Sequence, residues 1–567
     1  MFFQKKNWKI FLFFIFLRFK RCTQKPSIMS MKAHKKLLIS IFFVGLLTGN
    51  DYAFSQTSVS LNINSIEYKE NDYTIPSFTE LRRRHRAVEQ NPSSTRALAT
   101  RKNAIDNLKA KEMPYNIVMN IYDDPTSKMA FNWFTNAGIT GGQVQIVQGN
   151  VSNTNAFATT SVTTVNATST QINDLNYNVP ENRLNDVAGI ADFTKKSYTE
   201  NKALVTGLKP NTIYSFRVGK NGFWSEIGSF TTAKQNKDAF SFVYVTDTQG
   251  CRYSHFDAVQ RAVSAAFNQN PKANFWIHCG DLIDSSFGLC SEWEWEQLFE
   301  TQKTFFYQYP FAPVIGNHDN NAFPIFTNHF HTNSPDFDRN EPSRAVTPGS
   351  TYSFVYGDAL FFAINSEESN NKVYTDALIK WIRSEVAKNP DVKWRIAYYH
   401  SSVYTGNLSY QNSSNLRRWR NLIAPVFDEL QIDIALQGHS HIYEVIGPVN
   451  NKQLVANPVS NQQTVPVHPL ENLTGKLGGT FNTQAGTLYF LNNNIGTKKY
   501  EPKPLNQMVD PNTGISNYKN LFTGRFGQAG SPAFSNITVT TDTIFITTHE
   551  ILDDGSTRLF DKFKVVK

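Results

Sequence analysis

The sequence lacks any apolar run long enough to cross a bilayer. The apolar stretch from Leu37 to Leu47 is 11 residues long, the earlier segment FLFFIFL is shorter still, and no later run is longer. A membrane-spanning helix needs about 20 apolar residues. No membrane span is therefore predicted once a leader is removed.

Cysteine is scarce, with four in 567 residues: Cys22, Cys251, Cys279 and Cys290. Cys22 precedes the apolar stretch, which argues against a lipid anchor on it. The other three are an odd number, which excludes complete pairing in an exported protein. Cys279 ends an apolar run and is predicted to be a small core residue. Two alternatives remain open for Cys251 and Cys290, a bridge between two loops or two free thiols.

The chain also lacks a real excess of positive charge, although its formal net charge is +9. Ten of the 56 basic residues and only one of the 47 acidic residues, Asp51, lie in residues 1–55, so 46 of each sign remain beyond them. The basic character therefore belongs to a leader. No nucleic-acid-binding surface is predicted.

The leader, residues 1–55, has the pattern of a secretory signal. A cationic start precedes the apolar stretch, and small residues near Ala53-Phe54-Ser55 suit cleavage near Ser55. We expect translation to start at Met29 or Met31 and the mature protein to be secreted or periplasmic. The alternative is an uncleaved amphipathic anchor.

Polar residues follow five apolar, strand-like runs. They are Asp247 in FVYVTDTQG, Asp281 in FWIHCGDLID, Asn317 in APVIGNHDN, His400 in RIAYYHSS, and His439 with His441 in DIALQGHSH. Ligands of an open α/β sheet bind just outside the carboxyl ends of its strands. Taken singly, each motif is more often a turn than a site. Together, two carboxylates, an amide and three imidazoles predict a dinuclear metal site of a phosphoesterase.

The ordered set D-x-x, GD, GNH-D, H and GH-x-H resembles the calcineurin-like metallophosphoesterase superfamily. The segments WRIAYYHSSVY and IDIALQGHSHIYE resemble its purple acid phosphatase branch. The resemblance covers about residues 114 to 567. It implies a dimetal hydrolase of phosphate esters, preceded by a fibronectin-like domain.

The resemblance also implies a role for each site residue. Asp281 would bridge both metals, and His318 would act in the substrate pocket as an acid or a phosphate contact. The other implied ligands are Asp247 and His441 for the first metal, and Asn317, His400 and His439 for the second. Two divalent or trivalent ions of iron, zinc or manganese suit this donor set.

Two positions depart from the purple enzymes. Those enzymes have a tyrosine three residues after the bridging aspartate, where this chain has Asp284, and a D-x-G motif where this chain has Asp247-Thr248-Gln249. We therefore predict a colourless protein without an iron–tyrosinate. Asp284 is interpreted as a metal or pocket residue or as a helix N-cap. Gln249 is interpreted as a weak ligand or as pocket lining.

Two regions precede the motifs. Residues 56–113 form a polar N-terminal extension, whose cluster RRRHR is more often a solvated helix face than a binding patch. Residues 114–235 alternate apolar and polar residues in short runs, which predicts an all-β sandwich. In LKPNTIYSFRVG, Tyr214 is placed where a fibronectin III-like domain has its tyrosine corner, with its hydroxyl bonded to the chain upstream.

Residues 236–567 alternate strand-like and helical stretches, which predicts an α/β catalytic domain of two sheets flanked by helices. Helical faces are predicted in FDAVQRAVSAAFNQ and YTDALIKWIRSEVAKN, and a hairpin around Gly357-Asp358. Residues 450–520 are interpreted as long loops at the substrate entrance. The tail is expected to return to strands that complete the second sheet.

The predicted function is that of an exported phosphatase. Two metals would hold a hydroxide that attacks a phosphomonoester in line, and His318 would protonate the leaving group. One alternative is a phosphodiesterase or nucleotide hydrolase, because the same metal core serves both. A second alternative is a surface binding protein whose site has lost its activity. The oligomeric state is not indicated.

Overall fold

The computed structural model describes most of the chain beyond the leader. The described residues are 40–46, 52–58, 112–159, 161–176, 195–284, 291–319, 325–335, 349–411, 413–455, 479–504, 507–508, 515 and 518–567. Most of the predicted leader and extension, including the RRRHR cluster, lies outside them. None of the described helices has both the length and the apolar character that a membrane crossing requires.

Two strands in the N-terminal region form a separate small unit. β1 (Ser40–Leu46) and β2 (Tyr52–Ser58) pair antiparallel, with Ser40 opposite Ser58. They belong to a different compact unit from the rest of the described chain. β1 falls within the predicted signal, and β2 crosses the expected cleavage site.

The region from residue 115 to 231 is an all-β sandwich, as predicted. Its core lies between two layers and contains Phe131, Trp133, Val144, Phe216 and Phe230. One layer holds β3 (Tyr115–Asn120), β4 (Met129–Asn136), β8 (Lys195–Val205) and β7 (Thr168–Asn176). The other holds β6 (Thr163–Asn166), β5 (Gln143–Gln148), β9 (Ile213–Lys220), β10 (Phe223–Trp224) and β11 (Gly228–Thr231).

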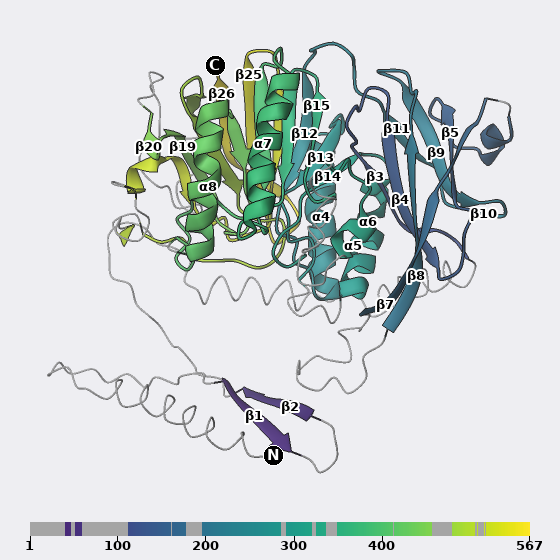
Figure 1. The fold of residues 1–567 in the computed structure, drawn as a ribbon, viewed down its shortest axis with the longest axis horizontal. Helices are drawn as coiled ribbons and strands as arrows, with labels where there is room; N and C mark the ends of the chain where they lie inside the picture. Colours follow the sequence, from purple (N-terminus) through teal and green to yellow (C-terminus); the bar gives the residue numbers. More distant parts are fainter. Residues whose placement is uncertain are drawn as a thin grey trace. The chain divides into compact units, whose positions relative to one another are not determined.

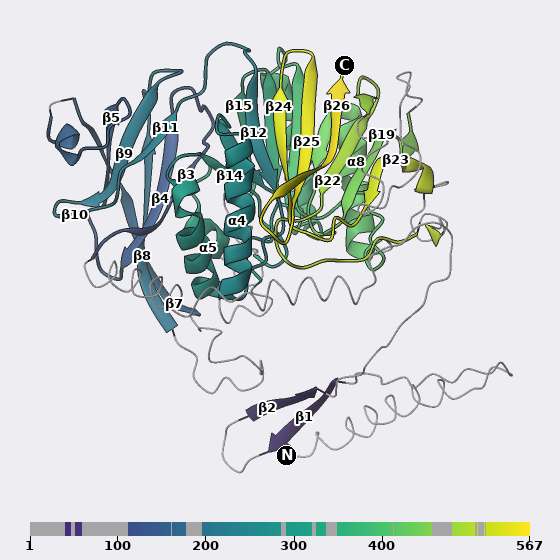
Figure 2. The ribbon, with the colours of Figure 1, turned by 180° about the vertical axis from the view of Figure 1, so that it is seen from behind.

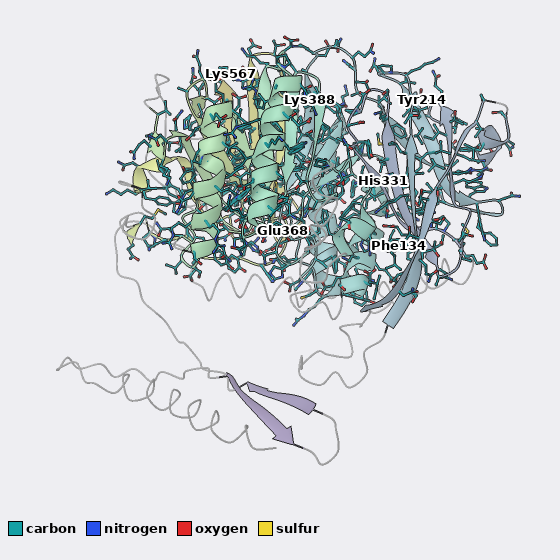
Figure 3. All side chains as sticks on the ribbon, viewed as in Figure 1. Phe134, Tyr214, His331, Glu368, Lys388 and Lys567 are labelled. Carbon is teal, nitrogen blue, oxygen red and sulfur yellow. The ribbon has the colours of Figure 1, made fainter. Side chains whose placement is uncertain are left out.

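Tyr214 makes the bond expected of a tyrosine corner. Its hydroxyl accepts a hydrogen bond of 2.9 Å from the backbone N–H of Lys209, five residues upstream. Figure 3 labels Tyr214 on the sandwich, where its ring packs on Phe230. The predicted hydrogen bond is confirmed, whereas the assignment to the fibronectin III type stays a prediction.

The remainder of the chain builds two sheets that face each other across an apolar core. The first contains β12 (Phe240–Val245), β13 (Phe275–His278) and β14 (Phe311–Pro313), joined by the C-terminal strands β24 (Ala533–Val539), β25 (Thr543–Ile551) and β26 (Thr557–Val566) and by β21 (Thr480–Asn482). The second contains β15 (Tyr352–Tyr356), β16 (Ala359–Ile364), β17 (Trp394–Tyr399), β18 (Ile434–Leu436), β22 (Thr487–Asn492), β19 (Tyr443–Asn450), β20 (Gln453–Leu454) and β23 (Phe522–Gly527). The predicted α/β class is confirmed.

Helices cover the outer faces of both sheets. α4 (Tyr253–Gln269) and α5 (Ser291–Phe306) share a core with β12 and β13, and the predicted face of α4 is buried there. α7 (Lys372–Lys388) and α8 (Ser414–Leu430) pack on the second sheet (Figure 1). Seen from behind, β24, β25 and β26 lie on the side opposite these two helices (Figure 2). Short helices among the described residues are α6 (Ile325–His329) and the 3-10 turns at Thr154–Ala158 and Tyr518–Leu521.

Of two local predictions in this domain, the hairpin is confirmed and the long loops are wrong in part. The hairpin is confirmed, because β15 and β16 pair antiparallel around Gly357-Asp358, with φ of +56° at the glycine. The interpretation of residues 450–520 as long loops is wrong for β22, which lies between β18 and β19 in the second sheet. The apolar run TLYFL is buried on both faces there, although Asn- and Gly-rich segments surround it.

The first of these two sheets continues into the sandwich. β14 pairs parallel with β3 through Phe311 and Asn120. The buried Asn120 amide extends this junction, because its Nδ2 donates to the Phe311 carbonyl at 3.0 Å and its Oδ1 accepts from the His331 N–H at 2.9 Å. Strands from both sides of the predicted boundary at residues 235 and 236 therefore belong to one continuous sheet of 11 described strands.

Candidate metal centre

The predicted ligand residues follow the carboxyl ends of strands and lie close together, as predicted from the sequence. β12, β13 and β14 run parallel, as do β16, β17 and β18. Figure 3 labels Glu368 and Lys388 at opposite ends of α7, and β17 returns from the Lys388 end toward the Glu368 end. Ser401, just after β17, donates to Glu367 at 2.8 Å. The centre therefore lies at the edge of the sheets marked by Glu368.

Two groups of side chains at this edge share Asp281. In one, Asp247, Asp281 and His441 each offer a ligand atom, and these atoms lie within 4.8 Å of one another. In the other, Asp281, His400 and His439 do the same. We name these the first and the second half-site. Because one carboxylate serves both, the arrangement can hold two ions joined by Asp281.

The backbone at these residues is held in an uncommon conformation. Of the 12 non-glycine residues with positive φ in the described part of the chain, five belong to this centre: Asp247, Gln249, Asp281, His439 and His441. Such conformations cost about 1–3 kcal/mol each and persist at sites where the surrounding structure imposes them. The strained backbone conformation thus occurs at residues whose side chains converge on this centre.

Two motif glycines are required by close packing of the loops. A Cβ on Gly316, in the GNHD motif, would lie 2.2 Å from both the backbone nitrogen and Oδ1 of Asp281. Gly280 has φ of +84°, and a Cβ there would lie 2.8 Å from the Cβ of His400. The loops after three strands thus touch backbone to backbone, which explains glycine directly before Asp281 and Asn317.

The imidazole orientations fit a bound cation. Nδ1 of His400 lies 2.8 Å from the Cys279 carbonyl oxygen, which only accepts, so Nδ1 carries the proton. In the neutral ring Nε2 then presents its lone pair to Asp281 Oδ2 and to Asn317 Oδ1, each 3.1 Å away. Three converging acceptors are stabilised by a cation between them. The donor set therefore fits a metal ion.

His441 repeats this arrangement in the first half-site. Its Nδ1 lies 3.2 Å from the Lys498 carbonyl oxygen, and its Nε2 lies 3.1 Å from Asp247 Oδ1. His439 completes the second half-site, with Nδ1 2.9 Å from Asn317 Oδ1 and 3.3 Å from His400 Nε2. Asn317 thus joins the second half-site, where the resemblance places it.

Burial and mutual charge set the protonation of the cluster. Burial alone would raise the pKa of Asp281, but the charge of His400 and a hydrogen bond from it hold that pKa below its usual value. Burial would lower the pKa of His400, yet the Asp281 carboxylate raises it well above the usual value. The ring can therefore carry a second proton on Nε2, and a bound cation would displace that proton and leave the neutral ring described above. For His439, burial and the neighbouring His400 lower the pKa to about 3. His439 is therefore neutral at ordinary pH and has a lone pair available.

Asp284, His318 and Lys498 form a charged cluster beside the two half-sites. Asp284 Oδ1 lies 3.2 Å from His318 Nδ1, and it also forms an ion pair with the Lys498 ammonium. The backbone N–H of His318 donates to Asp281 Oδ1 at 2.8 Å, which holds the backbone of His318 beside the bridging residue. The pocket interpretation of Asp284 accounts for these contacts. Its interpretation as a helix N-cap stays a prediction, because residues 285–290, between Asp284 and α5, lie outside the described part of the chain.

Gln249 lies against the bridging carboxylate rather than away from the site. Its Nε2 donates to Asp281 Oδ2 at 3.0 Å, whereas its buried Oε1 has no hydrogen-bond partner among the described residues. This contact agrees with a pocket-lining role, and a weak ligand role for Oε1 stays a prediction.

Asp319, the last residue of GNHD, has a role that was not predicted from the sequence. This buried carboxylate accepts from the N–H groups of Leu282 and Ile283 at 2.9 and 3.2 Å and from Gly316 at 2.9 Å. It therefore joins the loop of Asp281 to the loop of Asn317. Burial and the charge of Asp281 raise the pKa of Asp319 well above its usual value. Its place in the GNHD motif was the available signal.

The thiols play no part in this cluster. Cys251 is a half-buried free thiol, and Cys279 is free and buried in the core as predicted. Cys290 lies outside the described residues. Since Cys251 is free, the proposed bridge to Cys290 is not formed in this structure.

Comparisons with known proteins agree with the geometry. Residues 240–443 match the Calcineurin-like phosphoesterase family, and residues 114–232 match the Purple acid Phosphatase, N-terminal domain. A purple acid phosphatase from yellow lupin (Lupinus luteus) seeds has a similar structure, with a TM-score of 0.57 and 14% sequence identity over 80% of this chain and 74% of that chain. At this identity, the likeness shows a shared fold.

Curated relatives match over part of their length. An uncharacterized protein of Mycobacterium tuberculosis (strain ATCC 25618 / H37Rv) is 22% identical over 334 residues, 51% of this chain and 59% of that protein. A serine/threonine-protein phosphatase, CPPED1 of Rattus norvegicus, is 25% identical over 193 residues, 32% of this chain and 58% of that protein. The chain thus spans less than two thirds of these relatives. From the two family matches, the chain contains a calcineurin-like phosphoesterase domain at residues 240–443, preceded by a purple acid phosphatase N-terminal domain at residues 114–232.

Proposed function

We propose that this protein is an exported dimetal phosphatase that hydrolyses phosphomonoesters. The observation that carries the proposal is the position of Asp281, which belongs to two separate groups of potential ligands. A carboxylate shared by two ions suits a pair about 3.5–4 Å apart, the separation typical of two-metal phosphatases. Iron, zinc or manganese would fit the oxygen and nitrogen donors.

The ligand residues would hold the two ions in place before the substrate binds. Asp247 and His441 would hold one ion, and Asn317, His400 and His439 the other. Two bound ions would supply Lewis acidity and activate a water for attack on phosphorus. Asp281 and His400 are both buried, so the fixed charges act where water screens them little.

His318 is the proposed proton donor to the leaving alcohol. Its backbone N–H is bound to Asp281, and Asp284 contacts its Nδ1, so the imidazole is fixed beside the half-sites. A proton on Nδ1 is stabilised by the carboxylate, and Nε2 can then deliver a second proton to the leaving oxygen. The Lys498 ammonium adds positive charge near the same group, which favours an anionic substrate.

Export is proposed from the composition of the leader. Its cationic start, apolar stretch and small residues near Ser55 support a cleaved secretory signal. A secreted or periplasmic location would place the phosphatase outside the cytoplasm.

The test compares a chromogenic phosphomonoester with the matching diester. Protein stripped of metal is refilled with zinc, manganese or iron, and kcat/KM is measured for both esters. The Asp281→Asn protein, prepared identically, controls for contaminating phosphatases. We expect a strong monoester preference that one of the metals restores. A diester preference would contradict the proposed substrate class, and no turnover with any metal would contradict an enzymatic role.

A further inference from the structure

We propose that Leu408, Tyr410 and Tyr500 form an aromatic wall beside the metal centre that selects phosphate esters with an aromatic alcohol portion. The inference rests on the proposed function and specifies its substrate class. The three residues come from the segment after His400 and from the segment before Pro502. Neither segment contributes a predicted ligand.

The two tyrosines lie against opposite half-sites. The ring of Tyr410 is 4.4 Å from the ring of His439, at an interplanar angle of 32°. The ring of Tyr500 is 4.4 Å from that of His441, at 34°. The two tyrosine rings meet edge to face, with centroids 5.5 Å apart at 87°. The wall therefore extends along both half-sites, next to the place where an ester bound to the metals would project.

Backbone hydrogen bonds join the two segments that carry the wall. Asn407 and Pro502 form an antiparallel bridge. The Leu408 N–H donates to the Glu501 carbonyl at 2.9 Å, and the Lys503 N–H donates to the Gly406 carbonyl at 2.7 Å. Because these two segments are already ordered, the protein loses little conformational entropy when a ligand packs on them.

Buried amides attach the wall to the metal-binding segment. The Asn407 side chain donates to the Ser440 carbonyl at 2.9 Å and accepts from the Tyr410 N–H at 3.1 Å. The Gln528 amide donates to the carbonyls of His441 and Tyr500 at 2.7 and 2.8 Å. Both tyrosines are thus fixed relative to the HSH motif, which is the requirement for a selective surface.

The wall keeps apolar surface open to solvent. Tyr410 and Tyr500 are only half-buried, and Leu408 is 44% exposed, one of four large hydrophobic residues so exposed in the described part of the chain. The charged cluster of His318, Asp284 and Lys498 also lies beside the centre. A substrate that combines a phosphate with an aromatic ring matches this combination of charged and aromatic surface, because rings pack favourably against tyrosine faces and edges.

The alternative hypothesis is that the same tyrosines only hold the imidazoles of His439 and His441 in position, which we call bracing. Bracing predicts weaker metal binding when a ring is lost, with no change in ligand preference. Selection predicts a change in preference. A binding measurement with ligands that differ only in their organic group separates the two roles.

The experiment measures binding of benzylphosphonate and ethylphosphonate to the metal-loaded protein by titration calorimetry. Neither compound has a leaving group, so leaving-group reactivity does not enter. We expect benzylphosphonate to bind about two- to tenfold more tightly, the range of one aromatic contact. Tyr410→Ala and Tyr500→Ala should bring the ratio of dissociation constants close to one. Tyr410→Phe and Tyr500→Phe, which keep the rings, should preserve it.

Metal content is measured on every variant. A ratio near one in the unaltered protein would overturn the proposal, as would alanine variants that lose metal but keep the ratio. If the alanine variants cannot be loaded, Leu408→Asn decides, because Leu408 is 44% exposed, lies two residues before Tyr410 and is not a predicted ligand; an unchanged ratio there contradicts selection. Turnover of phenyl phosphate and glycerol phosphate is assayed in parallel. Loss of all turnover with an intact ratio would contradict the proposed function alone.

Discussion

The two half-sites around Asp281 differ in donor chemistry. The first combines two carboxylates, Asp247 and Asp281, with the single imidazole of His441. The second shares Asp281 but adds two imidazoles and the amide oxygen of Asn317. Carboxylates suit harder ions and imidazoles suit zinc and similar ions. We therefore expect the first half-site to prefer iron or manganese and the second to accept zinc.

The difference extends to how each half-site is supported. His441 is oriented by the Lys498 carbonyl, in the segment that follows β22, whereas His400 is oriented by the carbonyl of Cys279, directly after β13. The histidine of the second half-site is thus oriented by a strand end, and that of the first by a residue beyond the strand ends. A pair of ions with unequal environments is the expected result.

The largest effect should come from Asp281→Asn, which removes the only shared carboxylate among the described ligands. Both half-sites lose a charge, so we expect loss of both ions. A loss of several kcal/mol of transition-state stabilisation corresponds to a fall in kcat/KM of about three orders of magnitude. Metal analysis and kinetics test this, with His549→Gln, a half-buried histidine outside both half-sites, as control. Two retained equivalents of metal would refute the bridge.

Single-ligand variants should separate the half-sites. We expect Asn317→Ala and His400→Ala to lose the second ion and retain the first, and His441→Ala to do the reverse. Loss of an outer-shell partner alone costs about 10- to 100-fold in metal affinity, so loss of a direct ligand should cost more. Metal analysis after dialysis should find one equivalent in each variant. Near-normal metal content and turnover would show that the ligand assignment is wrong.

His318→Gln should leave both half-sites loaded and impair only the chemical step. The backbone N–H that donates to Asp281 is kept, so metal content should stay unchanged. Loss of a general acid typically lowers kcat by about 10²–10⁴. Asp284→Asn should have a smaller effect on kcat, since it weakens the support of His318 without removing it. If the deficit of His318→Gln appears only in KM, His318 binds phosphate instead of donating the proton.

The smallest effect concerns Glu444, three residues after His441. This buried side chain accepts hydrogen bonds from Thr405 and Gly406, and burial raises its pKa to about 8 from an unfolded value of 4.5. Between these values the folded protein keeps a proton that the unfolded chain releases, so stability falls as pH rises. Glu444→Gln should flatten the decline of Tm from pH 5 to 8. An unchanged slope would contradict this origin.

The convergence of the proposed ligand side chains could be predicted because every one of them follows an apolar strand at one edge of the fold. Asp247, Asp281 and His400 follow β12, β13 and β17 within a few residues. Lys498 could not be predicted, because it reaches Asp284 from 214 residues away and its own segment has no apolar period. The aromatic wall was missed for the same reason, since the contacts between its two segments are set by tertiary structure.

The fold was predictable where a local pattern decides the structure. The helical faces of α4 and α7 and the hairpin at Gly357-Asp358 are of this kind. β22 was missed because Asn and Gly surround a six-residue strand, although its burial on both faces favours a continuous apolar run. The pairing of β3 with β14 joins residues 191 apart in sequence and has no local signal.

The most direct test of the two-ion centre is anomalous X-ray scattering from crystals of the refilled protein. We expect two peaks about 3.5–4 Å apart, with Asp281 between them, Asp247 and His441 at one, and Asn317, His400 and His439 at the other. A single peak, or two peaks that do not share Asp281, would contradict this expectation.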